Sequence, residues 1–485
     1  MMAKNNSHII SVLIISVFMF MLNPYVSYSQ SRYDNSFPVR VGIFYGSVSK
    51  ASYAVSGTNI QIYDSSKKAI ETGAASLKVS LSSNIYVSSM SENSYEDAVQ
   101  SAKKYSDKAL VYYNNGEFYA GSTVPNADLI PALGSKAIFT LDDGRLIACE
   151  GSKVIGLSSE DSVTALENVK YRGKLNFYIK GSSLYAINEV GMQDYLYGVV
   201  PKEMVSSWEI EALKAQAIVA KNHTITNYNK HAADGFNVCK STHCQVYGGY
   251  SAEQEKTNQS VDKTEGIVMM YKGAPAEAYF HSSSGGRTES IGNMWNYGLD
   301  YMSGVKDPYS TGTPYDNWEA ILSASEIEQA LLRYNYDVGT VVGIKILEIS
   351  ENDRVMKLGV LGTKGMKILE KDGIRTVLGS SKFKSTYFTL TDTGVRSSSA
   401  LERNRSDINI QDNGLKNAFD KLDSFVSTRI SDEAQNFVSG SSFVFSGRGF
   451  GHGIGLSQYG ANNMAKEGND FKDIINYYFK GVTIG

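Results

Sequence analysis

The pattern of hydrophobic residues changes near residue 170, and this change most constrains the fold. Before it, short strand-like runs such as Val39–Phe44 continue to about Asn168, separated by Ser, Gly and Asn turns. After it, a long helix is predicted from about Glu209 to Tyr228, opened by a capping box of Ser206 and Glu209. We therefore predict an α+β fold. It has a mixed β-rich main domain with several helices around a cleft, and a smaller α+β accessory module near the N-terminus.

Residues 1–29 are predicted to be a secretory signal peptide. Lys4 precedes an apolar run of 14 residues, Ile9–Leu22, which is short of the roughly 20 residues that span a bilayer. Small residues at Ser27 and Ser29 suit a cleavage site. An uncleaved N-terminal membrane anchor is the alternative. Because no later stretch is apolar enough to span a membrane, we expect a protein that is secreted or held at the cell wall.

Residues 38–168 are predicted to form the accessory module or an insertion. A helix is expected from Ser94 to about Tyr105, followed by a hairpin of 109–113 and 117–121 across an Asn-Asn-Gly turn. The stretch of about 85–125 is weakly similar to a SPOR-type glycan-binding repeat. A module of no particular ligand is the alternative.

Residues 171–485 are predicted to form the main domain. It begins with a hairpin of 175–179 and 183–187, and it closes with a strand at 443–445 and helices at 456–466 and 471–479. The polar stretch 404–428 is predicted to be a surface excursion.

Composition excludes two classes of protein. The formal net charge of −3 at pH 7 leaves no electrostatic footprint for nucleic acid. Three cysteines, Cys149, Cys239 and Cys244, are too few for a disulfide scaffold, so stability must come from burial. The 32 tyrosines suit either core positions or stacking against sugar rings.

The segment 194–204 contains the candidate catalytic group, Glu203. Pro201 is predicted to stiffen a turn that places Glu203 just before the N-terminus of the next helix. Apolar neighbours would dehydrate the carboxyl and raise its pKa, which suits a general acid. A helix N-terminus would act in the opposite direction. A plain helix-end charge is the alternative interpretation.

Two further segments combine polar side chains with glycines. In 279–289, three serines and two glycines predict a loop with exposed donors, and Arg287 could clamp a carboxylate or lactyl group. A serine hydrolase is disfavoured there because no Gly-x-Ser-x-Gly elbow occurs. In 447–461, alternating glycines allow a ligand to approach the backbone around His452. The dinucleotide spacing of glycines is absent. Plain turns are the alternative for both segments.

Two imidazoles and two thiols lie within one short stretch, at His231, Cys239, His243 and Cys244. This donor set matches the tetrahedral preference of zinc in a structural site. A Cys239–Cys244 disulfide and two free thiols are the alternatives. His231 is the weakest ligand of the four, and Asp234 or water could replace it.

Taken together, these segments resemble the SpoIID/LytB family of stage II sporulation protein D lytic transglycosylases and amidase enhancers. The resemblance covers about Tyr171 to Gly485. It is carried, in the family's order, by Tyr195-Leu-Tyr-Gly-Val-Val-Pro-Lys-Glu-Met204, Glu211–Ala217, Cys239 with His243–Tyr247, His281-Ser-Ser-Ser-Gly-Gly-Arg-Thr-Glu289, and Gly447–Gly453 with Gln458–Ala461. Where the family commonly has Ala-Arg-Thr, this chain has Ala220-Lys221-Asn222, which puts an arginine-dependent contact in doubt.

The resemblance implies non-hydrolytic cleavage of the peptidoglycan bond between N-acetylmuramic acid and N-acetylglucosamine. Glu203 would act as acid and then as base, closing a 1,6-anhydro ring. Since no water is activated, the paired carboxylates of hydrolytic glycosidases are not needed. Some relatives hold zinc through a His/Cys set, so the resemblance favours a structural zinc, while the chemistry itself needs no cofactor. The substrate-binding residues carried over are Tyr197, Gln216, Gln245, Tyr247, His281, Ser282, Ser283, Ser284, Arg287, Arg448, His452 and Gln458.

The expected partners are peptidoglycan glycan strands and an amidase or other wall hydrolase, with no nucleic acid. The alternative function is a non-catalytic, wall-binding enhancer of an N-acetylmuramoyl-L-alanine amidase. The sequence leaves open the process served, the preference for denuded or peptide-bearing glycan, and the oligomeric state.

Overall fold

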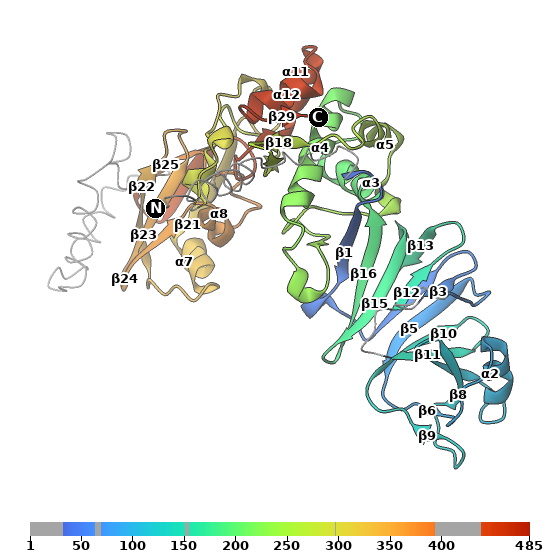
Figure 1. Ribbon diagram of the computed structural model, residues 1–485. Coiled ribbons are helices and arrows are strands. Elements are labelled where there is room, and N and C mark those ends of the chain that lie inside the picture. Colours follow the sequence, from blue (N-terminus) through green and yellow to red (C-terminus); the bar gives the residue numbers. More distant parts are fainter. Residues whose placement is uncertain (1–32, 64–68, 151–154, 296, 393–437) are drawn as a thin grey trace, which may run out of the picture.

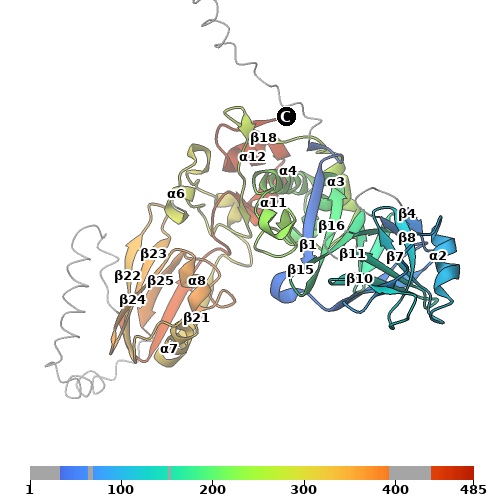
Figure 2. The ribbon, with the colours of Figure 1, turned by 60° about the horizontal axis from the view of Figure 1, so that its bottom comes forward.

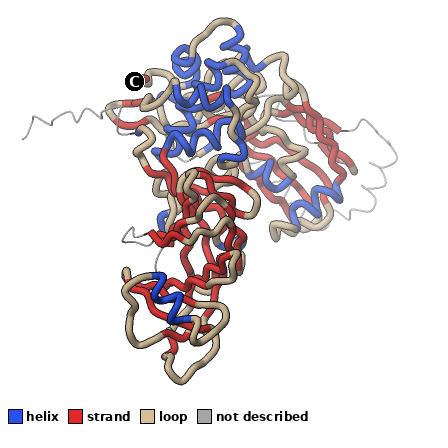
Figure 3. Tube along the Cα trace, turned by 90° about the vertical axis from the view of Figure 1, so that its right-hand side faces the viewer, coloured by secondary structure: helices blue, strands red, loops and turns tan. Residues whose placement is uncertain are grey.

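The computed structural model describes residues 33–63, 69–150, 155–295, 297–392 and 438–485. The predicted signal peptide and the excursion at 404–428 lie outside these residues. Figures 1 and 3 show most helices gathered between two strand-rich regions. This arrangement confirms the predicted α+β class.

The first sheet joins the N-terminal strand to the hairpin of the main domain. Its order is β17-β1-β16-β15-β12-β3-β4, with Val39 opposite Val190 in the antiparallel β1–β16 pair. Since β12 pairs with β15, strands from both sides of the boundary predicted at 168–171 share one sheet. The boundary itself stays a prediction. The strands are β1 Pro38–Phe44, β3 Gln61–Tyr63, β4 Ala69–Glu71, β12 Ile155–Ser158, β15 Lys174–Lys180, β16 Ser183–Gly191 and β17 Val238–Cys239.

The second sheet contains the predicted accessory hairpin, β7–β8. Asn115 and Gly116 take positive φ angles of 53° and 88° in its turn, as a tight two-residue hairpin requires. The helix α2 (Tyr95–Ala102) packs on this hairpin, and the Ser94 hydroxyl caps it by accepting from the Asp97 N–H at 3.1 Å. The predicted helix and hairpin are thereby confirmed, while the SPOR-like similarity stays a prediction. In sheet order, the strands are β14 Val169–Arg172, β13 Val163–Leu166, β2 Ser52–Ser56, β5 Ser76–Ser82, β10 Lys136–Leu141, β11 Leu146–Glu150, β7 Leu110–Asn114, β8 Glu117–Ser122, β6 Tyr86–Val87 and β9 Ile130–Pro131.

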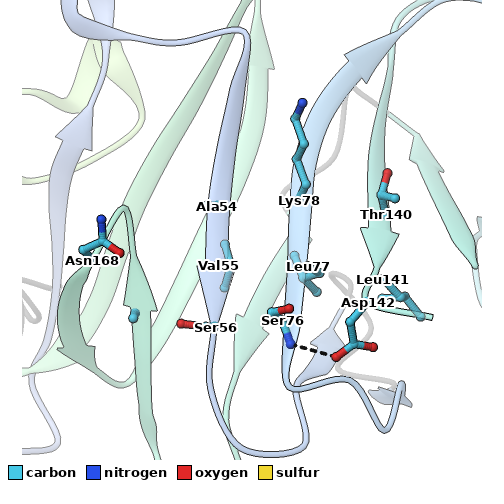
Figure 4. Close-up of a pocket in the computed structure, with 11 residues that line it drawn as sticks. Ala54, Val55, Ser56, Ser76, Leu77, Lys78, Thr140, Leu141, Asp142 and Asn168 are labelled. Carbon is cyan, nitrogen blue, oxygen red and sulfur yellow. Dashed lines mark hydrogen bonds between the residues drawn. The ribbon is translucent and has the colours of Figure 1, made fainter. Parts of the chain in front are cut away.

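A shallow cavity of about 400 Å³ opens over β13, β2, β5 and β10 (Figure 4). Small side chains such as Ser56, Ser76 and Ala165 leave this space on the sheet. At its rim, Asp142 Oδ2 accepts from the Ser76 N–H at 3.1 Å. None of the predicted site residues lines this cavity.

Helix α4 (Ile210–Thr226) is the centre of the main domain. Almost every residue from Ala212 to Thr224 is buried, as expected for a helix enclosed by protein on all sides. Around it lie α3 (Met192–Glu203), α5 (Glu255–Asp262), α11 (Gln458–Lys466) and α12 (Phe471–Tyr478) (Figure 1). Figure 2 shows α3, α11 and α12 beside α4 from a second direction. The two C-terminal helices confirm the predicted ones. The remaining short elements here are α6 Ile291–Met294, β18 Met269–Tyr271, β19 Ala274–Pro275, β20 Phe280–His281, β28 Leu456–Ser457 and β29 Thr483–Ile484.

A second strand-rich region has a hydrophobic core of its own. Phe383, Phe443 and Phe445 lie at its centre and are fully buried. Its sheets are β21-β27-β25 and β24-β23-β22-β26. Its elements are β21 Trp318–Ser323, α7 Ala324–Leu332, β22 Val341–Ile349, β23 Val355–Gly362, β24 Gly365–Glu370, α8 Gly373–Leu378, β25 Phe388–Asp392, β26 Val438–Ser439 and β27 Ser442–Gly447. In the part of the chain that the structure describes, no helix is long and apolar enough to cross a bilayer.

The predicted capping box at the start of α4 is wrong. The helix begins at Ile210, Glu209 is its N-cap, and no side chain caps it locally. Instead, Asn462 Oδ1 of α11 accepts from the Glu209 N–H at 3.0 Å. A partner from 253 residues away thus replaces the local cap.

Candidate active site

Glu203 is the last residue of α3, and the position of this helix is set by the N-terminal strand region. Asn35 Oδ1 accepts from the N–H groups of Gln193 at 3.1 Å and Asp194 at 3.3 Å, which satisfies two free donors at the helix N-terminus. Pro201 lies inside the helix rather than in a turn, and the backbone becomes extended at Met204. The predicted placement of Glu203 before a helix N-terminus is therefore wrong.

The environment of Glu203 favours a protonated carboxyl. The side chain is largely enclosed, and this burial raises its pKa, while a hydrogen bond from the Val246 N–H and the charge of Lys202 oppose the rise. Because the residue ends α3, it faces the negative end of the helix dipole, which also disfavours a carboxylate. The dipole thus acts in the direction opposite to the one predicted from the sequence.

The two carboxyl oxygens of Glu203 differ. Oε1 accepts from the Val246 N–H at 2.7 Å. Oε2 has no hydrogen-bond partner among the described residues, which leaves it as the oxygen that can carry a proton to a substrate. This is the geometry that a single general acid requires.

The residues beside Val246 serve as internal supports. Gln245 Nε2 donates to Thr224 Oγ1 at 2.9 Å and to the Ala220 carbonyl at 3.2 Å, and the Tyr247 hydroxyl donates to Asn188 Oδ1 at 2.7 Å. Both side chains are buried. They hold the loop against α4 and β16, so that the Val246 N–H faces Glu203. We find them placed as supports rather than as exposed substrate contacts.

The same loop carries the predicted metal ligands. One donor atom from each of His231, Cys239, His243 and Cys244 lies within 4.8 Å of the others. His243 Nδ1 is 3.2 Å from His231 Nε2, 3.7 Å from Cys239 Sγ and 3.9 Å from Cys244 Sγ. Bonds of 2.0 to 2.3 Å to a tetrahedral zinc separate its ligands by about 3.3 to 3.8 Å. The three measured separations lie within about 0.1 Å of this range, so the donor set is compatible with zinc.

His231 is oriented by a carboxylate, as metal-binding imidazoles commonly are. Its Nδ1 lies 3.6 Å from Asp234 Oδ2, and Lys180 Nζ lies 2.8 Å from Asp234 Oδ1. Its Nε2 is thereby left to face the cluster. Asp234 thus lies beside His231 and outside the four-residue cluster, and the identity of the metal ligands stays a prediction.

The two glycine-rich segments lie against each other. Ser283 and Phe450 exchange backbone hydrogen bonds of 3.1 and 2.8 Å, and His281 Nδ1 donates to the Ile454 carbonyl at 3.1 Å. The rings of His281 and His452 are 5.6 Å apart. Burial lowers the pKa of both imidazoles, which keeps them neutral near pH 7. The structure thus joins two segments that the sequence separates.

The predicted exposure of the serine donors is wrong for two of the three. Ser283 and Ser284 are fully buried, and the Ser284 hydroxyl donates to Asp307 Oδ2 at 2.7 Å. Ser282 is half-buried. Ser283 and Ser284 shape the loop because their polar atoms have partners inside the protein.

The two arginines have different surroundings. Arg287 Nη1 donates to the Glu351 carbonyl at 2.9 Å and to Asn352 Oδ1 at 3.3 Å, so its guanidinium links the loop to the β22–β23 turn. Arg448 is exposed, and its side chain has no hydrogen bond or ion pair with a described residue. Of the two, Arg448 is the one available for a ligand.

Three other residues that the family resemblance predicts to bind substrate connect helices to one another. Gln458 Nε2 donates to Gln216 Oε1 at 3.3 Å, which ties α11 to α4, and both side chains are buried. The Tyr197 hydroxyl donates to Asp262 of α5. No hydrogen bond between described residues joins these groups directly to Glu203, so their shared site and the predicted cleft stay predictions.

Lys221, at the position where the family commonly has arginine, is a structural tie. Its Nζ donates to the carbonyls of Thr264 at 2.6 Å and Ile267 at 3.2 Å, and burial lowers its pKa to about 8. The cation therefore anchors the loop after α5 in the core of the domain.

Sequence reasoning missed a group of aromatic residues near these segments: Trp208, Tyr315, Phe450 and Tyr459. Their rings contact one another in series. Two weak signals could have found them. The chain is rich in tyrosine, and Tyr459 lies within the Gln458–Ala461 motif.

Comparison with known proteins identifies two regions of the chain. Residues 180–271 match the family model described as stage II sporulation protein, and residues 307–405 match a domain of unknown function, DUF8618. The second match overlaps the region with the separate Phe383 core.

Curated relatives extend this similarity beyond residues 180–271. The stage II sporulation protein D of Bacillus subtilis is 28% identical over 316 residues, 62% of this chain and 76% of that protein. The amidase enhancer of Bacillus subtilis is 31% identical over 306 residues, 60% of this chain but only 40% of that protein. An uncharacterised protein of Brachyspira hyodysenteriae is 28% identical over 331 residues, 68% of this chain and 76% of that protein.

Proposed function

We propose that the chain, which is similar to stage II sporulation protein D and to an amidase enhancer, is a SpoIID/LytB-type exported peptidoglycan lytic transglycosylase of cell-wall remodelling or sporulation. It would cleave the bond between N-acetylmuramic acid and N-acetylglucosamine and leave 1,6-anhydro ends. The observation that carries this proposal is Glu203, a largely enclosed carboxyl with a raised pKa, one oxygen held by Val246 and the other free of described partners.

One carboxyl serves both steps of this reaction. Protonated Glu203 donates its proton to the glycosidic oxygen as the bond to the muramyl C1 breaks, which releases the N-acetylglucosamine end as an alcohol. The resulting carboxylate then takes the proton of the muramyl C6 hydroxyl, whose oxygen bonds to C1. The site regains its proton, and no water is consumed.

A zinc ion, when bound, would hold the loop rather than take part in bond cleavage. His231, Cys239, His243 and Cys244 would occupy all four tetrahedral positions and leave none open for a substrate. Cys244 stands two residues before Val246. The metal site would therefore help to keep the Val246 N–H on Glu203.

Mass spectrometry of digested, purified glycan tests the proposal. The wild type should release 1,6-anhydromuropeptides, and Glu203→Gln should lower their release by about 10²- to 10⁴-fold, since loss of a general acid has that effect. Glu209→Gln is the matched control, because Glu209 is exposed and its side chain caps nothing. Products with reducing muramic acid ends would show hydrolysis and overturn the proposal.

The second candidate function is enhancement of an N-acetylmuramoyl-L-alanine amidase. The similarity to the Bacillus subtilis amidase enhancer favours it. Under this alternative, Glu203→Gln would stimulate a purified amidase as well as the wild type does, and neither protein would form anhydro products. The same pair of variants thus separates the two functions.

A further inference from the structure

Four half-buried aromatic side chains form a continuous row. Ring centroids are 4.7 Å apart for Trp208 and Tyr459, 5.7 Å for Tyr459 and Tyr315, and 4.9 Å for Tyr315 and Phe450. We call this set the aromatic row. Its members come from the α3–α4 linker, α11, the loop before β21 and the loop after β27. None of the four residues is buried; each has an intermediate solvent exposure.

The row begins near the proposed acid. Trp208 follows Glu203 by five residues. The backbone N–H of Trp208 donates to the Val205 carbonyl at 3.0 Å, which closes a turn in the linker between α3 and α4. Five residues reach at most about 18 Å when fully extended, and this turn shortens the span. The first ring therefore lies within a few sugar lengths of Glu203.

The serine segment 282–284 is hydrogen-bonded to two residues of the row. The Tyr459 N–H donates to the Ser282 carbonyl at 3.0 Å, and the Phe450 N–H donates to the Ser283 carbonyl at 2.8 Å. The Gly449 N–H donates to the Tyr315 carbonyl at 2.7 Å. These bonds join the main chain of three of the four aromatic residues to the main chain of neighbouring segments. The main chain that carries these rings is thus held in place before a ligand binds, which lowers the entropic cost of binding.

Cations lie at the far end of the row. Lys384 Nζ is 5.3 Å from the centre of the Phe450 ring, and the exposed Arg448 stands two residues before Phe450. The carboxylate of Asp316, on the loop of Tyr315, is already bonded to the Gly312 N–H and to Thr313 Oγ1. The end of the row is therefore suited to carboxylates, which peptidoglycan carries on its lactyl groups or stem peptides.

We propose that the aromatic row is a binding subsite for the glycan strand. Sugar rings pack against the aromatic side chains of the row, as apolar sugar faces do on Tyr and Trp, and Lys384 and Arg448 meet carboxylates at the far end. The inference deepens the proposed function by naming where the polymer lies. Binding on the row does not depend on whether Glu203 is the acid.

The test is calorimetric binding of denuded glycan chains of two and of four disaccharide units to full-length Glu203→Gln protein. Added to this background, Tyr315→Leu and Phe450→Leu should each weaken binding of the long chain roughly threefold to tenfold, the range for one aromatic contact. In the same variants, the affinity for the long chain divided by the affinity for the short chain should also fall. Tyr315→Phe retains the ring and should retain the ratio, which separates stacking from misfolding.

Tyr334→Leu is the matched control. Tyr334 is 43% exposed and lies just after α7, in the strand-rich region around Phe383. Its hydroxyl donates to the Thr376 carbonyl, outside the aromatic row. The proposal is overturned if the Tyr315→Leu, Phe450→Leu double variant keeps the wild-type ratio, or if Tyr334→Leu lowers the ratio equally. Failure of the proposed transglycosylase would appear elsewhere, as unchanged product release in the Glu203→Gln protein.

Discussion

The backbone N–H of Val246 donates to Glu203 Oε1 at 2.7 Å, across 43 residues of sequence. This bond joins the end of α3 to the loop that carries the metal ligands. It stabilises the carboxylate form, whereas burial stabilises the protonated form more strongly. A residue that must give up a proton and take one back benefits from such opposing influences, because neither protonation state is then inaccessible.

The first prediction concerns stability against pH. The pKa of Glu203 is raised in the folded state. Below the unfolded-state pKa the carboxyl is protonated in both states and does not destabilise the folded protein. As the pH rises from there through the folded-state pKa, the carboxyl must ionise in its buried position, so the free energy of unfolding falls. Glu203→Gln should therefore melt at a higher temperature than the wild type at pH 7 to 8, and the difference should vanish at about pH 4. Melting curves across this range check it. A wild type that is the more stable protein at pH 8 would contradict the raised pKa.

The second prediction concerns the pH dependence of activity. A general acid with a raised pKa works while it is protonated, so 1,6-anhydro product formation should fall as pH rises through that pKa. Rates measured from pH 4 to 9 give the descending limb. His281 and His452 should add no limb between pH 7 and 9, because burial lowers the pKa of both.

The third prediction concerns the metal. Purified protein should contain close to one zinc per chain by elemental analysis, and a chelator should lower its melting temperature, because metal binding stabilises only the folded state. Cys239→Ala should lose the metal, whereas Cys149→Ala should keep it, since Cys149 lies on β11 in the accessory sheet. Absence of zinc together with a mass deficit of two hydrogens would instead indicate a Cys239–Cys244 disulfide.

The fourth prediction concerns the buried carboxylate of Glu289. Its Oε1 accepts from the Ser290 N–H at 2.6 Å, from Asn293 Nδ2 at 2.9 Å and from Asn352 Nδ2 at 2.8 Å, and its Oε2 accepts from the Ser350 hydroxyl. Glu289→Ala leaves these donors unpaired and should cost about 2 to 4 kcal/mol of unfolding free energy. The exposed Glu319 provides the control, since its alanine variant should stay within about 0.5 kcal/mol. Chemical denaturation of the two variants measures both changes in the free energy of unfolding.

The fifth prediction concerns the N-terminal support of α3. Asn35→Ala removes the acceptor for the Gln193 and Asp194 N–H groups and should cost about 1 kcal/mol, as loss of a helix cap does. Asn84→Ala, at an exposed position, should be neutral. If both variants unfold at the same denaturant concentration, Asn35 contributes nothing to α3.

Local patterns sufficed for elements that are stabilised by their own residues. The Asn-Asn-Gly turn predicted the β7–β8 hairpin, because only residues that tolerate positive φ close so tight a turn. The apolar pattern of about 209–228 predicted α4, and the donor types at 231–244 predicted a cluster that the structure brings within 4.8 Å. Motifs spread along the chain were enough to recognise the SpoIID/LytB family.

Contacts between distant residues lay beyond the sequence. Glu203 could not be placed at the end of a helix, because α3 contains Pro201 and takes its N-terminal cap from Asn35. The cap of α4 comes from Asn462. The aromatic row brings four separate segments together, and no single segment indicates that these rings lie side by side.

Sequence by itself therefore determined the class of fold, the resemblance to the SpoIID/LytB family and the residue types available for chemistry, since these depend on periodicity and local spacing. Only the tertiary structure decided which oxygen of Glu203 is free, in which direction its pKa moves and which aromatic residues lie together. Desolvation and long-range hydrogen bonds control these properties, and both arise only when the chain has folded.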